Sequence, residues 1–151
     1  MSCPLCDTDG GRLLFSDRHL RVIAVDDPDY PGFTRVIWHD HVAEMTDFAP
    51  VDRDRIMAAV YTIERVLRDT LAPDKVNLAA FGTMVPHLHW HIIPRWAGDR
   101  HYPDAYWSAA RVSPGQESPQ WHRALAERAA RVAAFERALS TALSTAATIA
   151  P

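Results

Sequence analysis

The sequence has few cysteines, no long apolar run and no excess of positive charge, and each absence excludes a class of protein. Two cysteines in 151 residues are too few for a disulfide framework. No apolar run approaches the roughly 20 residues of a membrane-spanning helix, so we expect no membrane partner. A net charge of -3 argues against binding to long nucleic acid. The N-terminus lacks the pattern of a secretory signal, so we expect a cytoplasmic protein.

The pattern of apolar residues predicts an α+β fold. Runs rich in β-branched and aromatic residues, bounded by Pro, Gly and Asp, predict strands. These strands lie at 13–15, 20–25, 33–38, 75–81 and 87–94. Apolar residues at spacings of three and four predict one long helix at 50–71, which Pro73 ends. The order of these elements favours an antiparallel sheet of about five strands.

The character of the chain changes beyond residue 95. Residues 96–119 are dense in Pro, Gly, Trp and Tyr and predict a long ordered loop. Ser118 as N-cap and Pro119 at the first helical position predict a C-terminal helix, with fraying over 144–151. We therefore expect a main domain at 1–100 and an extension at 101–151, packed together as a single domain.

The two cysteines form a C-x-x-C pair, Cys3 and Cys6. A redox pair of this spacing usually lies between a strand and the helix it opens, and no strand precedes this one. The spacing also allows both thiolates to bind one tetrahedral zinc ion, with histidines as the other ligands because no further cysteine is present. Two unligated thiols on a mobile terminus are the third possibility.

His87, His89 and His91 alternate with large apolar residues along the last predicted strand. Alternation places the three imidazoles on one face at intervals of about 6.7 Å. Two imidazolium charges at that separation repel by about 2.5 kcal/mol at an effective dielectric constant of about 20. At least one ring is therefore neutral near pH 7 and available as nucleophile, base or metal ligand. A bound phosphate would relieve the repulsion.

A metal-dependent hydrolase that uses these histidines as ligands is one alternative, because H-x-H places two ligands on one face. Such a site often includes a carboxylate. No Asp or Glu lies within ten residues upstream of His87, and the next one, Asp99, follows the strand. This pattern weakens the metal-hydrolase hypothesis.

The segment 87–93 resembles the signature of the histidine triad (HIT) superfamily of nucleotidyl hydrolases and transferases, His-φ-His-φ-His-φ-φ with φ apolar. The segment 32–41 resembles the family's Gly-His-x-Leu-Val-Ile-Pro-Lys-x-His, ending on His41. Asn77 stands where the family has an Asn near the nucleoside and phosphate. The resemblance covers about residues 3–100 and implies a HIT-like fold and a homodimer.

The resemblance implies that the triad is catalytic. The middle histidine, His89, is implied to attack the α-phosphorus of a dinucleoside polyphosphate or nucleoside phosphoramidate, with a purine nucleoside phosphate as substrate. The covalent nucleotidyl-histidine is then hydrolysed by water. His91 is implied to contact the phosphate and assist the leaving group, and His87 completes the triad. In the family, a hydrogen bond from the nucleophile's other ring nitrogen to the main chain fixes its tautomer, and no catalytic metal is required.

The resemblance also implies a structural zinc ion. Several branches of the family hold zinc with an N-terminal C-x-x-C and two histidines. The corresponding ligands here are Cys3, Cys6, His41 and His87, with His39 a less favoured substitute for His41. Two sulfurs and two nitrogens form a closed tetrahedral site. Such a site predicts that chelation lowers stability while the folded protein stays active.

The sequence departs from the family in the loop before the triad. The usual Gly-x-x-Ala-Gly-Gln is replaced by the shorter segment 82–86, which has no Gln, and Thr83 is the candidate to donate a hydrogen bond instead. This loss favours, as an alternative, a nucleotide-binding regulatory protein with weak or no turnover. The family's ribose-binding acid corresponds to Asp26 or Asp27.

Four residues after the triad strand remain to be assigned. Trp107 is the strongest aromatic candidate for a base-stacking role, although most such residues pack a loop onto the core. Arg95, Arg100 and His101 are expected at the surface or in a dimer contact.

Overall fold

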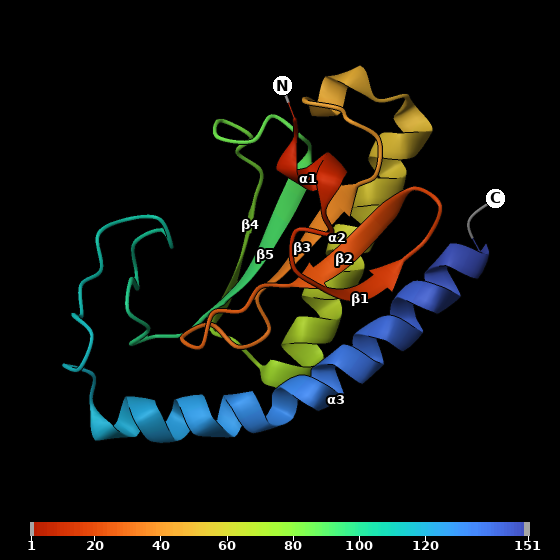
Figure 1. Cartoon of the computed structure of the whole chain (residues 1–151). Helices are drawn as coiled ribbons and strands as arrows, with labels where there is room; N and C mark the ends of the chain where they lie inside the picture. The colour runs from red at the N-terminus through yellow and green to blue at the C-terminus, as the bar shows by residue number, and fades with distance from the viewer. Residues whose placement is uncertain (1, 150–151) are drawn as a thin grey trace.

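The computed structural model describes residues 2–149 and contains one five-stranded sheet, in the order β1-β2-β3-β5-β4 (Figure 1). Its strands are β1 (Arg12–Ser16), β2 (Leu20–Ala24), β3 (Thr34–Trp38), β4 (Lys75–Ala79) and β5 (His89–Arg95). Every neighbouring pair is antiparallel. The predicted α+β class and strand number are therefore confirmed.

The two long helices begin as the sequence predicts. α2 (Pro50–Leu71) starts at its proline and ends where Ala72 adopts a left-handed conformation. α3 (Pro119–Ile149) is capped by Ser118, whose Oγ accepts the Trp121 amide at 3.1 Å. We expected α3 to fray from residue 144, and this expectation is wrong for residues 144–149, because the Ala-rich helix continues past the residues that are packed in the core. Residues 150–151 lie outside the described part of the chain.

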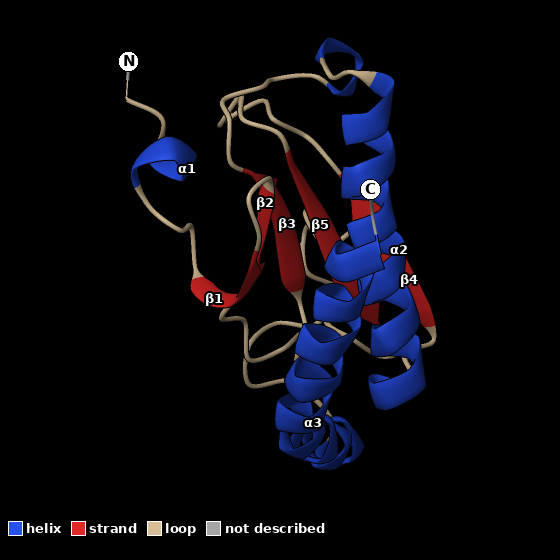
Figure 2. Ribbon diagram, turned by 90° about the vertical axis from the view of Figure 1, so that its right-hand side faces the viewer, coloured by secondary structure: helices blue, strands red, loops and turns tan. Residues whose placement is uncertain are grey.

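Both long helices cover one face of the sheet, as Figure 2 shows. Ile63 and Leu67 of α2 and Phe135 and Leu139 of α3 are fully buried in one cluster with Ile92 of β5. Burying a side chain of this size contributes about 1.5–3 kcal/mol. These contacts hold β5 against the helix layer. None of the helices in residues 2–149 is long and apolar enough to cross a membrane.

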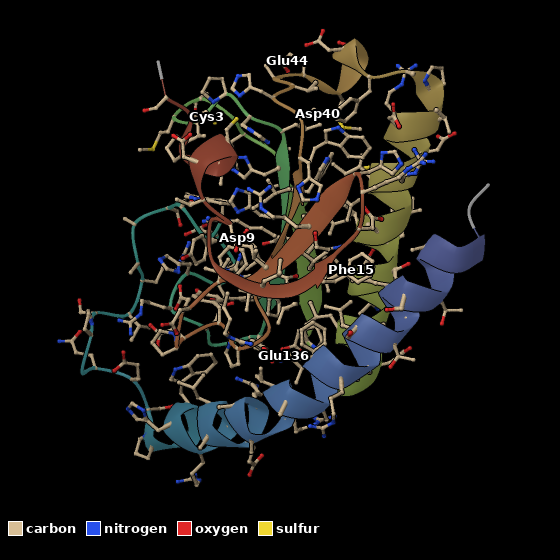
Figure 3. The ribbon with its side chains drawn as sticks, turned by 45° about the vertical axis from the view of Figure 1, so that its right-hand side comes forward. Cys3, Asp9, Phe15, Asp40, Glu44 and Glu136 are labelled. Atoms are coloured by element: carbon tan, nitrogen blue, oxygen red, sulfur yellow. The ribbon has the colours of Figure 1, made fainter. Side chains whose placement is uncertain are left out.

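The opposite face is partly covered by the N-terminal segment, which contains the short helix α1 (Pro4–Asp7) that the periodicity did not predict (Figure 2). Leu5 packs there against Ile23 and Ile37. Arg21 is buried and donates to three main-chain oxygens of this segment, those of Leu5, Thr8 and Asp9. These bonds attach the segment to the sheet and position the C-x-x-C pair, of which Cys3 is labelled in Figure 3.

The segment between β5 and α3 folds back onto the sheet, and its arginine at the strand end is not a surface residue. Arg95 is 3% exposed and donates to both carboxylate oxygens of Asp99 at 2.7 and 3.0 Å, so its expected position at the surface or in a dimer contact is wrong. The physical reason is that Asp99, four residues later, is also buried and compensates the charge. Burial by itself raises the pKa of Asp99, but hydrogen bonds from Arg95 and from the His101 amide outweigh this effect and hold the pKa below its ordinary value.

The rest of this segment is attached by further polar and ring contacts. Arg100 is half-buried and pairs with Asp29 and with Glu117 at 2.6 Å. Its neighbour His101 has Nδ1 at 2.6 Å from the hydroxyl of Tyr30. Neither residue is therefore a free surface group in the described chain. A short 3₁₀ helix, η1 (Met45–Asp47), precedes α2 in the chain.

The start of α3 is held by an arginine between two indole rings. The guanidinium carbon of Arg128 lies 4.4 Å from the ring centroid of Trp96 and 5.0 Å from that of Trp121. Cation–π contacts of this kind contribute about 0.5–2 kcal/mol. The loop and the helix that follow β5 are thus packed onto the same body as the sheet.

Candidate active site and metal cluster

Strand β5 divides its side chains between two environments. Leu88, immediately before the strand, and Ile92 belong to the core under the helices. His89 and His91 point to the opposite face, as strand alternation requires. His91 pairs directly with Arg35 of β3, and His89 pairs with Ile37. The buried face therefore orders the strand, while the other face displays imidazoles.

His89 is half-buried, and its orientation is set by the main chain. Its Nδ1 lies 2.6 Å from the carbonyl oxygen of His87, so Nδ1 carries the proton and donates it to that oxygen. Nε2 then carries the lone pair and faces away from the main chain. Burial lowers the pKa of His89, although the hydrogen bond to the His87 carbonyl opposes this shift. The lowered pKa favours the neutral ring, which is the form needed for attack on an electrophile.

His91 adjoins His89, with ring centroids 4.9 Å apart. Its Nδ1 accepts a hydrogen bond from Nε of Arg35 at 3.2 Å. Burial lowers the pKa of His91 to about 3, and the charges of Arg35 and His89 act in the same direction. A neutral ring that accepts at Nδ1 carries its proton on Nε2, so His91 is a hydrogen-bond donor toward the site.

Aromatic rings surround His91. The ring of Phe33 lies 5.9 Å from His91, and that of Trp107 lies 5.1 Å away. Trp107 also contacts Phe81, with centroids 4.4 Å apart. Phe81 and Trp107 remain 58% and 48% exposed, although both are large and apolar. Trp107 thus belongs to the triad surroundings, and it is brought there by the segment that follows β5.

The predicted substrate-binding residues are not gathered as one group. Asp27 accepts hydrogen bonds from the Asp29 amide at 3.0 Å and from the Tyr106 hydroxyl at 2.7 Å. Asp26, its neighbour, is exposed. Burial and then the bond to Asp27 raise the pKa of Tyr106 to about 12, so this hydroxyl stays protonated. Asp27 therefore joins the β2–β3 turn to the segment that carries Trp107.

Asn77 and Thr83 both precede the triad in the chain. Asn77 sits on β4, and its Oδ1 accepts from Nη1 of Arg95 at 2.8 Å. Thr83 is exposed in the turn between β4 and β5. No hydrogen bond or ring contact recorded for residues 2–149 joins either side chain to His89 or His91.

A second constellation lies beside the first triad histidine. The structure brings together Cys3, Cys6, His41 and His87, with one ligand atom from each and all four atoms within 4.8 Å of one another. Nδ1 of His87 lies 3.4 Å from both sulfurs, and Nδ1 of His41 lies 3.4 Å from Sγ of Cys6. His39 lies elsewhere, with Nε2 at 3.0 Å from the oxygen of Asp17.

This donor set fits zinc. In a tetrahedral zinc site a sulfur and a nitrogen ligand are about 3.6 Å apart, from the usual bond lengths, and the observed separations are close to that value. Nε2 of His87 lies 2.7 Å from the carbonyl oxygen of Trp38. This bond fixes the tautomer that leaves the Nδ1 lone pair for a metal, as is usual for metal-binding histidines.

Sequence reasoning missed Arg35, Phe33 and Phe81 as neighbours of the triad. Arg35 had a detectable signal, since it is the only charged residue in the otherwise apolar and hydroxyl-bearing run 33–38. Its position beside His91 depends on the pairing of β3 with β5, which one strand by itself does not specify.

Sequence comparison matches this chain to a domain family and to a named relative. A profile of the HIT domain family matches residues 10–98. An AP-4-A phosphorylase from Mycobacterium tuberculosis is 30% identical over 81 residues, which cover 50% of this chain and 42% of that protein. The match thus spans less than half of that relative's length.

The solved structures that resemble this chain include two histidine triad proteins. A histidine triad protein from Bradyrhizobium japonicum is 26% identical, with a TM-score of 0.66 over 87% of this chain and 89% of that one. A Zn-bound histidine triad family protein from Mycobacterium smegmatis is 27% identical, with a TM-score of 0.56 over 91% and 98% of the two chains.

Proposed function

The chain belongs to the HIT domain family, and on that basis we propose that it transfers a nucleoside monophosphate from a dinucleoside polyphosphate or a nucleoside phosphoramidate to water. The observation that carries the proposal is the hydrogen bond between Nδ1 of His89 and the carbonyl oxygen of His87. It presents the nucleophilic Nε2 of a neutral imidazole on the face of the sheet opposite the two long helices. The name of the mycobacterial AP-4-A phosphorylase supports a purine dinucleotide as substrate.

The proposed reaction has two displacements. Nε2 of His89 forms a bond to the α-phosphorus, and the bond from that phosphorus to the leaving oxygen or nitrogen breaks. His91, with its proton on Nε2, donates a hydrogen bond to the phosphoryl or leaving group. Water then attacks the phosphorus, the bond to His89 breaks, and the water protons are shared between the nucleoside monophosphate and the leaving group. Two moderate barriers replace one high barrier.

The test is a single-turnover reaction with diadenosine tetraphosphate and with adenosine phosphoramidate, analysed by intact-protein mass spectrometry. A nucleotidyl adduct on the wild type that is absent from His89→Ala supports the proposal. His39→Ala is a matched control, because this histidine lies outside the triad and the metal cluster. An adduct that persists in His89→Ala contradicts it. Nucleotide binding without adduct or turnover would favour the regulatory-protein alternative.

Phosphorolysis is the second candidate, because the name of the relative from M. tuberculosis describes it. Inorganic phosphate then takes the place of water and attacks the nucleotidyl-histidine, so that diadenosine tetraphosphate and phosphate give ADP and ATP. Hydrolysis of the same substrate gives AMP and ATP. Chromatography of the products formed with and without phosphate separates these two reactions.

We further propose that Cys3, Cys6, His41 and His87 hold a structural zinc ion. A zinc ion there would cross-link the N-terminal segment to the sheet, and no step of the proposed reaction needs it. The Zn-bound relative from M. smegmatis supports this assignment. Activity that is lost on chelation from folded protein and restored by metal would instead support a hydrolase that binds its metal through the triad.

The family resemblance also supports a cytoplasmic homodimer, in which residues 1–100 form the HIT domain and 101–151 an extension packed on it. The end of the family match at residue 98 is consistent with that boundary. Sedimentation equilibrium tests the oligomeric state, since a monomer at micromolar concentration would contradict this part of the proposal.

A further inference from the structure

Arg35 occupies a position that places a positive charge beside the triad. It lies directly opposite His91 in the β3–β5 pair, so both side chains leave the same face of the sheet. The family motif has an apolar Leu at this position, and the loop before the triad lacks the family's Gln. The chain therefore carries a cation beside the triad at a position that is apolar in the family motif.

The charge of Arg35 has no carboxylate partner. No ion pair joins it to an Asp or Glu among residues 2–149, whereas the half-buried Arg100 pairs with Asp29 and with Glu117. The buried Arg21 also lacks a carboxylate, but three main-chain oxygens accept its hydrogen bonds. Within the same described range, the one side-chain hydrogen bond of Arg35 runs from Nε to Nδ1 of His91.

The terminal nitrogens of Arg35 remain free to bind a ligand. The residue is half-buried, neither terminal nitrogen makes a hydrogen bond within the described chain, and neither is fully buried, so both contact solvent. The guanidinium carbon lies 5.8 Å from the ring centroid of Phe33, which holds one side of the group. A partly desolvated cation with an unneutralised charge is costly, and a bound anion would offset that cost. A guanidinium also matches the geometry of a phosphate.

The groups beside Arg35 supply no positive charge of their own. His91 accepts from Arg35 and is neutral, so it contributes a hydrogen bond and no net charge. His89 is occupied as the donor to the His87 carbonyl. Among the side chains that contact the triad rings, Arg35 is thus the permanent cation.

We propose that Arg35 binds the phosphoryl oxygens of the nucleotide beside His89 through its terminal nitrogens, while its Nε holds His91 in the tautomer that donates from Nε2. This role rests on the proposed function, because the anion is the phosphate next to the nucleophile. Charge-assisted hydrogen bonds to a phosphate stabilise both the bound substrate and the developing negative charge in the transition state.

The test compares the binding of AMP with that of adenosine by isothermal titration calorimetry. Arg35→Met keeps the apolar stem and removes the charge, and we expect it to weaken AMP binding by about ten-fold or more. Adenosine has no phosphate, so its affinity should be unchanged. Arg35→Lys should keep most of the preference for AMP, because it retains a charge. Arg65→Met, on the exposed face of α2, is the matched control and should bind like the wild type.

The tautomer provides an independent readout. Nitrogen NMR of the histidine rings should show His91 protonated on Nε2 in the wild type and in Arg65→Met, and a changed tautomer ratio in Arg35→Met. A mere packing role for Arg35 would weaken AMP and adenosine binding in parallel, and that result would overturn the proposal. Equal affinity of the wild type for AMP and adenosine would do so too.

These outcomes are separable from those of the proposed function. Covalent transfer can fail, with no adduct on His89, while AMP binding still depends on Arg35. Conversely, an adduct that forms at the wild-type rate in Arg35→Met, with unchanged AMP affinity, would refute the role of Arg35 and leave the nucleophile assigned to His89.

Discussion

The carbonyl oxygen of His87 lies 2.6 Å from Nδ1 of His89, while the ring of His87 has its own Nδ1 at 3.4 Å from the sulfurs of Cys3 and Cys6. One residue therefore orients the candidate nucleophile with its main chain and contributes to the candidate metal site with its ring. Its Nε2 is bound to the oxygen of Trp38, so the ring is held from both sides.

Removal of zinc should lower stability while sparing the activity of the folded protein. A ligand present at about a thousand times its Kd stabilises a fold by about 4 kcal/mol, so chelation should lower the Tm of zinc-loaded wild type by on the order of 10 °C. Cys6→Ser should start from the lower Tm and respond little to the chelator. Calorimetry of both proteins with and without chelator measures this, and an equal response of the two would contradict the assignment of Cys6.

Loss of the Asp99 carboxylate should destabilise the fold strongly. Asp99→Asn leaves the guanidinium of Arg95 buried without its counter-charge, and breaking such a pair costs roughly 3–5 kcal/mol. Urea unfolding followed by tryptophan fluorescence gives the free energy of unfolding. Asp104→Asn is a suitable control, because its ion pair with Arg111 is exposed and should have little effect. Similar free energies for the two variants would show that the buried pair is dispensable.

Stability should also decrease in acid through Asp99. Its pKa in the fold lies below the ordinary value of 3.8, so the unfolded chain takes up a proton first as the pH falls. The stabilisation is therefore complete above about pH 5 and is lost as the pH falls through the folded pKa. Unfolding measured between about pH 2 and 6 should give a shallower acid dependence for Asp99→Asn than for the wild type. Parallel curves would mean that other carboxylates dominate acid unfolding.

Trp107 should affect dinucleotide substrates more than small ones. Its exposed ring lies beside His91 and Phe81, where the second base of a diadenosine polyphosphate can stack. Stacking of a base on an aromatic ring is worth about 1–3 kcal/mol. Trp107→Ala should therefore raise KM for diadenosine tetraphosphate by about ten-fold and change KM for adenosine phosphoramidate much less.

The control for Trp107 is Tyr61→Ala, which removes another exposed aromatic ring, on α2 and away from the triad. Steady-state kinetics on both substrates distinguishes the cases. Equal losses on the two substrates would indicate that Trp107 only supports the packing of His91.

Local patterns predicted the parts of the fold that local physics decides. Alternation on β5 assigned the histidines to one face, and the apolar spacing gave α2 with its bounds, because each depends on residues a few positions apart. Ser118 was identified as the cap of α3 for the same reason. The helix α1 has four residues, too few to show a periodicity, and was not predicted.

The missing parts of the site depend on contacts between residues that are distant in the sequence. Arg35 reaches His91 only through the strand pairing, and Trp107 reaches it only because the segment after β5 folds back. Arg95 was expected at the surface or in a dimer contact. The structure buries it with Asp99, which is only four residues away but is itself held by the hydroxyl of the distant Tyr30.

The alternation of β5 links the chemistry of the chain to its folding. A slip of one residue in the pairing with β3 would turn His89 and His91 under the helices and bring Leu88 and Ile92 to the surface, so a misregistered chain would lose its core and its nucleophile together. Under the proposed mechanism, only correctly paired molecules can form the nucleotidyl-histidine. The amplitude of adduct formation in a single turnover would then count natively folded molecules, which makes the reaction an active-site titration of refolding yield.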